Sequence, residues 1–259
     1  FMLIDWCDTL HVELRSNGQL SREDLTSEMP AEDLVLRAAR ALQAYAPAGS
    51  GAHIGVAKHI PAQAGMGGGS SDAATCLLAL NRLWKLDLPL ATLEKVGLSI
   101  GADVPFFLRG HNAWVEGIGE IITPIELPSA DVVVAKPDQG LDTKSIFVAP
   151  DLERATKPAT ISGFAACSAQ DARQVFGFGR NDLQPVAQRL CPAVTQAIDW
   201  LGTKGLQARM TGSGSAVFAM SAAKLHETDF SDAPKGWSVR QCKNLSVHPL
   251  AGWADSDNS

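Results

Sequence analysis

The chain has 259 residues, of which 46% are hydrophobic and 19% charged, a balance typical of one large or two ordinary globular domains. This composition excludes a disordered chain. The 22 Lys and Arg residues stand against 28 Asp and Glu residues, so the net charge is −6. This charge disfavours nucleic acid as the main partner, because binding to a phosphate backbone depends on clustered cations.

Cysteine usage and hydropathy exclude further classes. The five cysteines are scattered and form no C-x-x-C pair, which predicts reduced thiols and a cytoplasmic protein. No apolar run reaches the ~18 residues of a membrane helix, so we expect no membrane partner. The sequence contains neither a zinc-type Cys/His cluster nor a G-x-S-x-G nucleophile motif.

The first 60 residues predict two strands and a helix. Alternating apolar residues at positions 10–14 indicate a half-buried strand, and the polar, turn-rich stretch 16–30 indicates a hairpin or a loop. Residues 33–45 predict a helix, and residues 52–60 a second strand that carries Lys58. This lysine either reaches a nucleotide or is simply solvated. The expected inward face of the helix comprises Leu34, Ala38, Leu42 and Tyr45.

A glycine-rich loop that leads into a helix occupies residues 61–84. Glycine reaches positive φ without steric cost and lets a ligand approach the backbone closely. The helix is predicted by apolar residues at spacings of three and four: Ala73, Leu77, Leu80 and Trp84. We expect Ser70 or Ser71 as its N-cap and Asp72 in its first turn. A helix start of this kind leaves backbone N–H groups unpaired and suits a phosphate chain.

The two familiar phosphate motifs do not describe this loop. No lysine follows the glycines, as a P-loop requires, and Ser70 occupies the third glycine position of the dinucleotide fingerprint G-x-G-x-x-G. A glycine-rich loop that merely starts a helix is the alternative. Four glycines followed by Ser-Ser favour the phosphate site.

Residues 89–98 predict a second amphipathic helix, followed by G-A-D-V-P-F-F at 101–107. Asp103 in this run is either an N-cap or a general base, and capping would also fix its carboxylate. Residues 111–124 predict a β-hairpin with glycines near its turn. Glu116 and Glu120 resemble a catalytic carboxylate pair, but two charges on a turn are the favoured interpretation.

The composition changes at residues 123–130, where we place a linker between domains 1–127 and 128–259. The second half predicts the following elements in chain order: a buried strand at 131–137, a short helix from Thr143, a loop and helix within 151–170, a helix opening at 181–183, a helix at 192–201, and a strand at 237–247.

A second glycine cluster, A-R-M-T-G-S-G-S-A-V-F-A-M, spans residues 208–220. It predicts a tight turn at 211–214 and a strand from Ser215 to Met220. An ordinary hairpin turn is one interpretation. The other is a second loop of backbone N–H groups that faces the first across a cleft, so that the two bracket a triphosphate and its acceptor.

The run P-x-x-x-G-M-G-G-G-S-S-D-A-A at 61–74 resembles the ATP-binding motif of the galactokinase, homoserine kinase, mevalonate kinase and phosphomevalonate kinase (GHMP) family. The runs A-L-N-R-L-W at 79–84 and G-A-D-V-P-F-F at 101–107 extend the resemblance over nearly the whole chain. It implies a two-lobed α+β fold. The first lobe is expected to be like ribosomal protein S5 domain 2, and the second ferredoxin-like.

The resemblance also implies an activity. It is strongest to the bacterial and plastid branch of the family that phosphorylates the 2-hydroxyl of a cytidine-diphosphate sugar alcohol in non-mevalonate isoprenoid synthesis. Such an enzyme is a cytoplasmic monomer or weak homodimer that uses ATP and Mg²⁺. The alternatives are another small-molecule kinase of the homoserine or mevalonate type, and a nucleotide-binding regulator without catalysis.

The family pattern assigns roles to positions of this sequence. Asp103 matches the catalytic aspartate, and Asp103, Ile118, Thr143 and Gly212 match substrate positions. Ser70 is a weak candidate for Mg²⁺. The ATP-binding positions are Leu34, Lys58, Pro61, Ala62, Gln63, Ala64, Gly65, Met66, Gly67, Gly68, Gly69, Ser70 and Ser71, with Glu32 and Asp33 expected near the adenine. The family's catalytic lysine and Tyr-His pair have no match here, and we expect them in an upstream segment.

Overall fold

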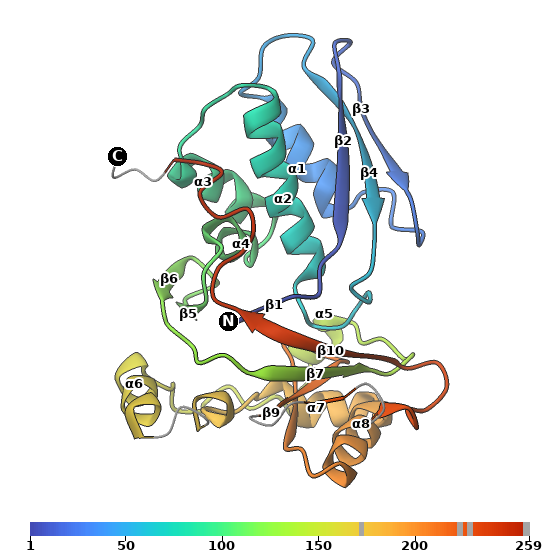
Figure 1. Cartoon of the computed structure of the whole chain (residues 1–259), viewed down its shortest axis with the longest axis vertical. Helices are drawn as coiled ribbons and strands as arrows, with labels where there is room; N and C mark the ends of the chain where they lie inside the picture. The colour runs from blue at the N-terminus through green and yellow to red at the C-terminus, as the bar shows by residue number, and fades with distance from the viewer. Residues whose placement is uncertain (171–173, 222–224, 227–229, 256–259) are drawn as a thin grey trace. The chain divides into compact units, whose positions relative to one another are not determined.

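The computed structural model describes residues 1–170, 174–221, 225–226 and 230–255. Helices and strands mix in an α+β arrangement that divides into two units (Figure 1). The first unit comprises Phe1–Ile60, Gly67–Glu126 and the C-terminal segment from Leu245, and the second comprises Pro61–Met66 and Leu127–Asn244. The chain therefore leaves the first unit and re-enters it within the glycine-rich loop.

The helices and strands of the first unit are, in chain order, β1 (Leu3–Ile4), β2 (Thr9–Arg15), β3 (Leu20–Asp24), α1 (Leu34–Gln43), β4 (Gly51–Ala57), α2 (Gly68–Leu83), α3 (Leu90–Ile100), α4 (Val104–Arg109), β5 (Ala113–Glu116) and β6 (Ile121–Pro124).

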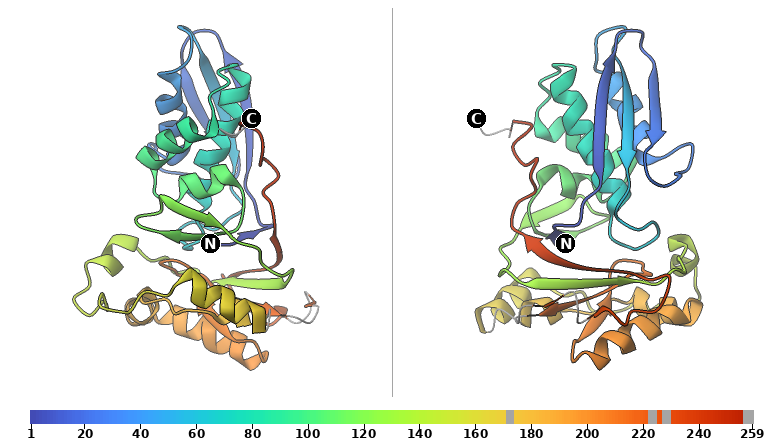
Figure 2. Two further views of the ribbon diagram at one scale, coloured as in Figure 1. Left: turned by 90° about the vertical axis from the view of Figure 1, so that its left-hand side faces the viewer. Right: turned by 45° about the vertical axis from the view of Figure 1, so that its right-hand side comes forward.

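The sheet of the first unit has the order β2–β4–β3, with β2 antiparallel and β3 parallel to β4. Parallel neighbours need a crossover, and α1 supplies it between β3 and β4. The hairpin considered for residues 16–30 is therefore wrong: β3 pairs with β4 and not with β2. Helices α1 and α2 pack side by side against one face of this sheet (Figures 1 and 2).

The core of the first unit lies between this sheet and its helices. The four predicted inward residues of α2 are all buried. On α1, Ala38 and Leu42 are buried, but Tyr45 lies two residues past the end of the helix and is 52% exposed, so its predicted inward position is wrong. The largest fully buried side chains here are Val35, Leu42, Ile54, Val56, Leu77, Leu80, Leu93, Val104 and Phe106.

Helix α2 begins earlier than the sequence predicts. Gly67 occupies the N-cap position with a φ of 71°, so the chain already turns into the helix at Gly68. Ser70 and Ser71 therefore lie within the first turn and do not cap it. Asp72 lies beyond that turn and is buried, so its predicted place in the first turn is also wrong.

The C-terminal segment belongs to the first unit because backbone hydrogen bonds attach it there. The N–H of His248 donates to the carbonyl of Gly110 at 2.8 Å, and the N–H of Leu90 donates to the carbonyl of Asp255 at 3.0 Å. The guanidinium of Arg82 also lies 4.6 Å from the ring centre of Trp253, a cation–π contact.

The helices and strands of the second unit are β7 (Asp131–Lys136), α5 (Thr143–Phe147), α6 (Ile161–Gln170), the 3₁₀ helix η1 (Gln174–Gly177), α7 (Leu183–Leu190), α8 (Pro192–Thr203), β8 (Ala208–Met210), β9 (Val217–Ser221) and β10 (Ser238–Leu245). Each helix and strand predicted for the second half is present, with its ends shifted by a few residues.

In the second unit, β10, β7, β9 and β8 lie in this order and are antiparallel throughout. Helices α7 and α8 cover one face of these strands (Figure 1). The core between them is formed by Val133, Ala135, Leu141, Ile146, Val186, Ala187, Val194, Ala197, Leu201, Met210, Val217 and Ala219.

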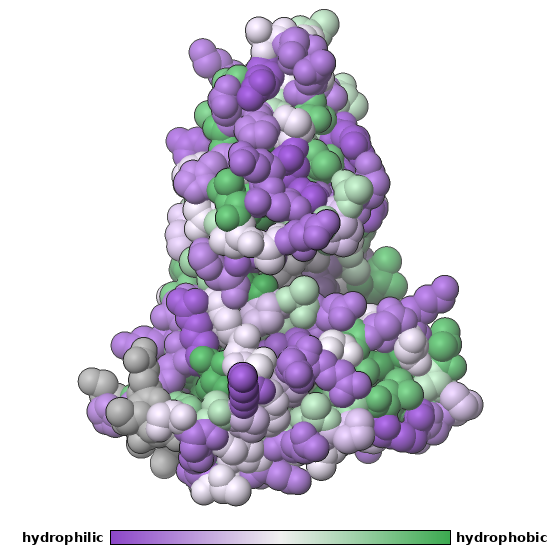
Figure 3. Space-filling view, turned by 90° about the vertical axis from the view of Figure 1, so that its right-hand side faces the viewer, coloured by the Kyte–Doolittle hydropathy of each residue, from purple (hydrophilic) through white to green (hydrophobic). Residues whose placement is uncertain are grey.

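Hydrophilic residues cover most of the face shown in Figure 3, and hydrophobic residues are scattered among them in small groups. Small exposed apolar groups are normal on a protein surface. Among the described residues, no helix combines the length and the apolar character that crossing a membrane requires.

Candidate active site

The N-terminus of α2 is open. Gly67 has no side chain to cap the helix, and a helix leaves its first N–H groups without intrahelical partners. The N–H groups of Gly68, Gly69 and Ser70 therefore depend on water or a ligand for a hydrogen bond. The helix dipole adds positive potential at the same place. This is the arrangement that binds phosphate at helix N-termini.

Three neighbours pack closely around this helix start. A Cβ added at Gly67 would lie 3.0 Å from the ring of Phe107, and one at Gly69 would lie 3.5 Å from Cδ1 of Leu34. A Cβ added at Gly101 would lie 3.8 Å from Oγ of Ser70. The glycine-rich loop and the run at 101–107 thus meet within the first unit, as two motifs far apart in the sequence.

Asp103 immediately precedes α4 and occupies its N-cap position, but its side chain makes no capping hydrogen bond. Burial raises the pKa of this carboxyl above its usual range. The prediction that Asp103 occupies the N-cap position is therefore confirmed, but its carboxylate does not accept the hydrogen bond that a capping side chain would accept. The side chain is left available for proton transfer.

The hairpin predicted at 111–124 is present as β5 and β6. A Cβ added at Gly119 would lie 2.5 Å from the carbonyl oxygen of Ala102, so the hairpin turn packs against the residue before Asp103. Ile118, beside that glycine, is 75% exposed. Glu120 accepts a hydrogen bond from the N–H of Ile118 at 2.7 Å, which supports its interpretation as a turn residue.

Lys58 does not point into solvent. Its ammonium forms ion pairs with Asp8 and with Asp72, the latter at 2.6 Å. Burial raises the pKa of Asp72 to about 6, against the opposing effect of Lys58. Burial lowers the pKa of Lys58, but the two carboxylates, Asp72 first, more than offset this and leave it raised. Sequence reasoning missed Asp8, because an aspartate before a strand gives no signal of its own.

In the second unit, the segment 61–66 is held by the second glycine cluster. The N–H groups of Ser215 and Ala216 donate to the carbonyls of Gln63 and Ala64 at 3.1 and 3.2 Å, and the hydroxyl of Thr211 donates to the carbonyl of Gly65 at 3.0 Å.

These bonds correct two expectations. The loop at 61–66 and the turn at 211–216 are in direct contact, so the predicted cleft does not lie between these two segments. The strand predicted from Ser215 begins only at Val217, because Ser215 and Ala216 use their N–H groups on the loop. Gly65 and Gly212 allow the close approach: a Cβ at Gly212 would lie 2.6 Å from the carbonyl oxygen of Gly65.

Thr143 lies beside the same turn. Its hydroxyl and that of Ser213 are hydrogen-bonded at 2.8 Å, and Asp142 caps α5 through the N–H of Ser145 at 3.0 Å. Phe147 follows Thr143 by one helical turn and is 53% exposed.

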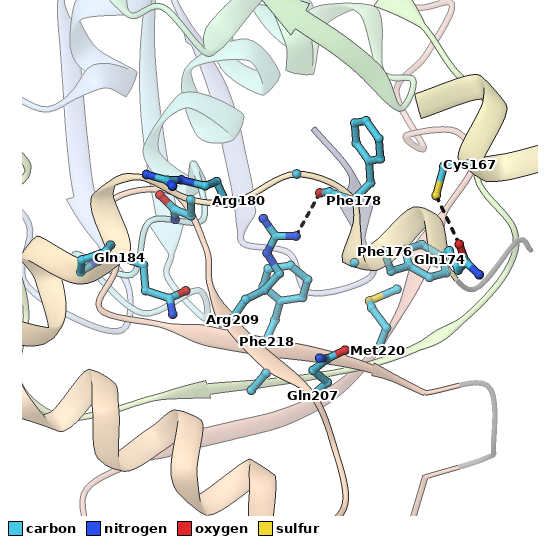
Figure 4. Close-up of a pocket in the computed structure, with 15 residues that line it drawn as sticks. Cys167, Gln174, Phe176, Phe178, Arg180, Gln184, Gln207, Arg209, Phe218 and Met220 are labelled. Atoms are coloured by element: carbon cyan, nitrogen blue, oxygen red, sulfur yellow. Dashed lines mark hydrogen bonds between the residues drawn. The ribbon is translucent and has the colours of Figure 1, made fainter. Parts of the chain in front are cut away.

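The second unit contains a cavity of about 1000 Å³, lined by residues of η1, α7, β8 and β9 and of the segment between η1 and α7 (Figure 4). The guanidinium of Arg209 points into it and donates to the carbonyl of Phe178 at 3.1 Å, and burial lowers the pKa of this arginine. The amide of Asn181 in its wall donates to the carbonyl of Gly212 at 2.8 Å. The wall of the cavity therefore helps to hold the Gly212 turn.

The described residues contain no group of three or more His, Cys, Asp or Glu side chains that could hold a metal ion. The hydroxyl of Ser70, at the start of α2, remains a single candidate oxygen. A Mg²⁺ ion that keeps waters and phosphate oxygens as ligands needs no more than one or two protein oxygens.

Two family models match the chain. The model of the GHMP kinases N terminal domain matches residues 33–111, and that of the GHMP kinases C terminal matches residues 164–235. The first match covers α1 to α4 with the start of α2 and Asp103. The second covers the Gly212 turn.

Curated relatives match over almost the whole chain. A 4-diphosphocytidyl-2-C-methyl-D-erythritol kinase of Variovorax paradoxus is 71% identical, over 98% of this chain and 88% of its own length. A protein of the same name from Paracidovorax citrulli is 62% identical, over 100% of this chain and 88% of its own length.

Solved structures share the fold. A crystal structure of 4-(cytidine 5'-diphospho)-2C-methyl-D-erythritol kinase matches with a TM-score of 0.75 at 30% identity, over 93% of this chain and 87% of that one. Homoserine kinase from Cytophaga hutchinsonii matches with a TM-score of 0.70 at 15% identity, over 95% of this chain and 88% of that one, which shows the fold alone.

The contact between Gly65 and the turn at 211–214 predicts a large effect of one methyl group. In Gly65→Ala the new Cβ would lie 2.6 Å from the nitrogen of Gly214, at a φ of 69°. We expect a loss of more than about 2 kcal/mol in the free energy of unfolding, measured by urea denaturation. Gly202→Ala is the control: it lies within α8 in open space and should stabilise by about 0.5–1 kcal/mol. Equal stability of Gly65→Ala and wild type would contradict the contact.

Proposed function

The chain belongs to the GHMP kinase family, and we propose that it transfers the γ-phosphoryl group of ATP to the 2-hydroxyl of 4-diphosphocytidyl-2-C-methyl-D-erythritol. The observation that carries the proposal is the 71% identity, over nearly the full chain, to a kinase named for this substrate, together with the open start of α2 in the family's ATP motif.

The relatives favour this kinase over the alternatives. Homoserine and mevalonate kinases share the fold at only 13–16% identity, whereas the relatives named for the cytidylyl substrate reach 60–71%. A regulator without catalysis is disfavoured for two reasons. Those relatives are named as kinases, and the carboxylate of Asp103 is not used in a capping hydrogen bond.

For ATP, we propose that the free N–H groups at the start of α2 hold the phosphates. Gly67 to Ser71 then form the part of the motif nearest the phosphates, and Pro61 to Met66 complete the loop. Leu34 packs beside Gly69 and is assigned to the adenine side of the site. Magnesium would accompany the triphosphate, with the Ser70 hydroxyl as its protein oxygen, and would supply neutralisation of the phosphate charge.

For the acceptor, we propose Asp103 as the general base. An alcohol that attacks the γ-phosphorus must lose its proton, and a positioned carboxylate can accept it. Ile118, on the turn that packs against Ala102, is the second contact that the first unit offers. In the second unit, Thr143 and Gly212 are the substrate positions, and the exposed ring of Phe147 offers a stacking face to the cytosine.

We further propose that the protein works in the cytoplasm as a monomer or weak homodimer, without nucleic acid as a partner. All five cysteines are free, in keeping with a reducing compartment. The net charge of −6 disfavours nucleic acid.

A substrate comparison tests the proposal. We expect the full-length protein to release ADP with 4-diphosphocytidyl-2-C-methyl-D-erythritol and not with homoserine or mevalonate, in a coupled assay. Asp103→Asn should lower kcat by about 10²- to 10⁴-fold, because it removes the base. Asp199→Asn, an exposed position on α8, is the matched control and should leave kcat unchanged.

Each other outcome points elsewhere. Turnover with homoserine or mevalonate would keep the kinase and discard the substrate. ATP binding without turnover of any acceptor would indicate the regulator. Full activity of Asp103→Asn would remove Asp103 from the chemistry.

The raised pKa of Asp103 predicts a pH dependence. The base must be ionised to accept a proton, so kcat falls as the pH drops below the pKa of this carboxyl. Because burial raises that pKa above the usual 3.8, the fall should begin at a higher pH than for an ordinary aspartate. The measurement is kcat against pH with both substrates saturating. A kcat that stays constant down to the pH at which the protein unfolds would contradict the assignment.

A further inference from the structure

An ion cluster of three side chains lies beside the start of α2. Lys58, just after β4, donates from its ammonium to Oδ2 of Asp8 and to Oδ2 of Asp72. The side chains of Asp8 and Asp72 are only 1% and 5% exposed, and that of Lys58 is 13% exposed. The cluster is therefore almost completely desolvated.

The cluster fixes the chain on both sides of the glycine-rich loop. Before the loop, Oδ1 of Asp8 accepts hydrogen bonds from the N–H groups of His59 and Ile60, the latter at 2.8 Å. After the loop, Asp72 is the fifth residue of α2. Lys58 joins the two carboxylates, so one ammonium ties the entry of the loop to the helix that follows it.

The first residue of α2 rests on the same cluster. A Cβ added at Gly68 would lie 3.1 Å from Cγ2 of Ile60 and 3.6 Å from Oδ2 of Asp8. Because Gly68 has no side chain, the first residue of α2 can lie directly against Ile60 and Asp8. The direction of its free N–H groups therefore depends on Ile60 and Asp8, which the hydrogen bonds of the cluster hold in place.

The charges argue against a direct role of Lys58 at the phosphates. The cluster carries two carboxylates and one ammonium, a net charge of −1. If the ammonium left to meet a phosphate, two buried carboxylates would remain unpaired next to each other, and removing one partner from a buried ion pair is strongly destabilising. Lys58 is therefore expected to stay paired with Asp8 and Asp72 when ATP binds.

We propose that Lys58 is a positioning residue, which through Asp8 and Asp72 holds the start of α2 in the geometry that binds the ATP phosphates, without touching the nucleotide. The proposal rests on the proposed function, because it takes the start of α2 as the phosphate site.

Removal of the cation from the cluster tests it. In Lys58→Met the two buried carboxylates lose their counterion, so they either repel one another or one of them takes up a proton, and in both cases the link between the loop entry and α2 is lost and the helix start shifts. We expect the KM for ATP and the Kd for ATP by calorimetry to rise about tenfold or more, with the acceptor KM changed less than about threefold. In Lys58→Met/Asp72→Asn the repulsion between the carboxylates is gone and the new amide at position 72 can donate to Asp8, which restores a link between the loop entry and α2, so both ATP constants should return to within about threefold of wild type.

A direct ligand gives a different pattern. If Lys58 touched a phosphate, the double variant would stay as weak as Lys58→Met, because no cation is restored, and this result would overturn the proposal. An unchanged ATP affinity in Lys58→Met, with only a lower melting temperature, would overturn it as well. Lys95→Met, an exposed position on α3, is the matched control.

Two further measurements keep the test decisive. If Lys58→Met does not fold, Asp72→Ala alone still discriminates: it cuts the tie between Lys58 and α2, so its ATP affinity should be several-fold weaker than that of wild type. An affinity equal to or tighter than that of wild type, as expected if a released Lys58 met a phosphate, would overturn the proposal. If wild type shows no turnover with the cytidylyl substrate, the proposed function fails by itself. If wild type turns over the cytidylyl substrate but the double variant does not regain ATP affinity, the proposed function stands and only the positioning role of Lys58 is overturned.

Discussion

The open start of α2 is the constraint on which the rest of the first unit depends. A helix that begins after a glycine with positive φ has no side-chain cap, so its first N–H groups need an external acceptor. Leu34 and Phe107 pack against the glycines of this turn, and Gly101 lies against Ser70. That last contact brings the run with Asp103 to the helix start, so the open helix start and a carboxylate that makes no capping hydrogen bond share one unit. Phosphoryl transfer depends on such positioning more than on covalent chemistry by the protein.

The glycines of the loop at 65–69 are needed for different reasons in the two units. Gly67 and Gly68 serve the first unit, where one makes the turn into α2 and the other allows the helix to rest on Ile60 and Asp8. Gly65 serves the second, where it lets the loop approach the Gly212 turn without a Cβ between the two backbones. A run that looks uniform in the sequence thus contains positions with distinct reasons for lacking a side chain. The buried ions around Lys58 add a fixed support to the part that leads into α2.

Much of this arrangement could be predicted from the sequence, because periodicity reports burial. The apolar face of α2 and the strand at β7 follow directly from their patterns, and the hairpin at β5 and β6 from its turn residues.

What could not be predicted depended on contacts between distant residues. Strand β3 looked like half of a hairpin because nothing local shows that it pairs with β4. Asp72 looked like a helix-start charge because its partner, Lys58, lies fourteen positions earlier and Asp8 fifty before that. The contact between the two glycine clusters was likewise invisible, since turn chemistry alone does not tell a free turn from one that holds another loop. The roles assigned to individual site residues came from motif resemblance, and they stay predictions.

The most direct test of the account is a crystal structure of the protein with a non-hydrolysable ATP analogue and Mg²⁺. The account predicts phosphate oxygens within about 3 Å of the N–H groups of Gly68, Gly69 and Ser70, with Lys58 still between Asp8 and Asp72. A triphosphate bound away from the start of α2, with those N–H groups left to water, would contradict it.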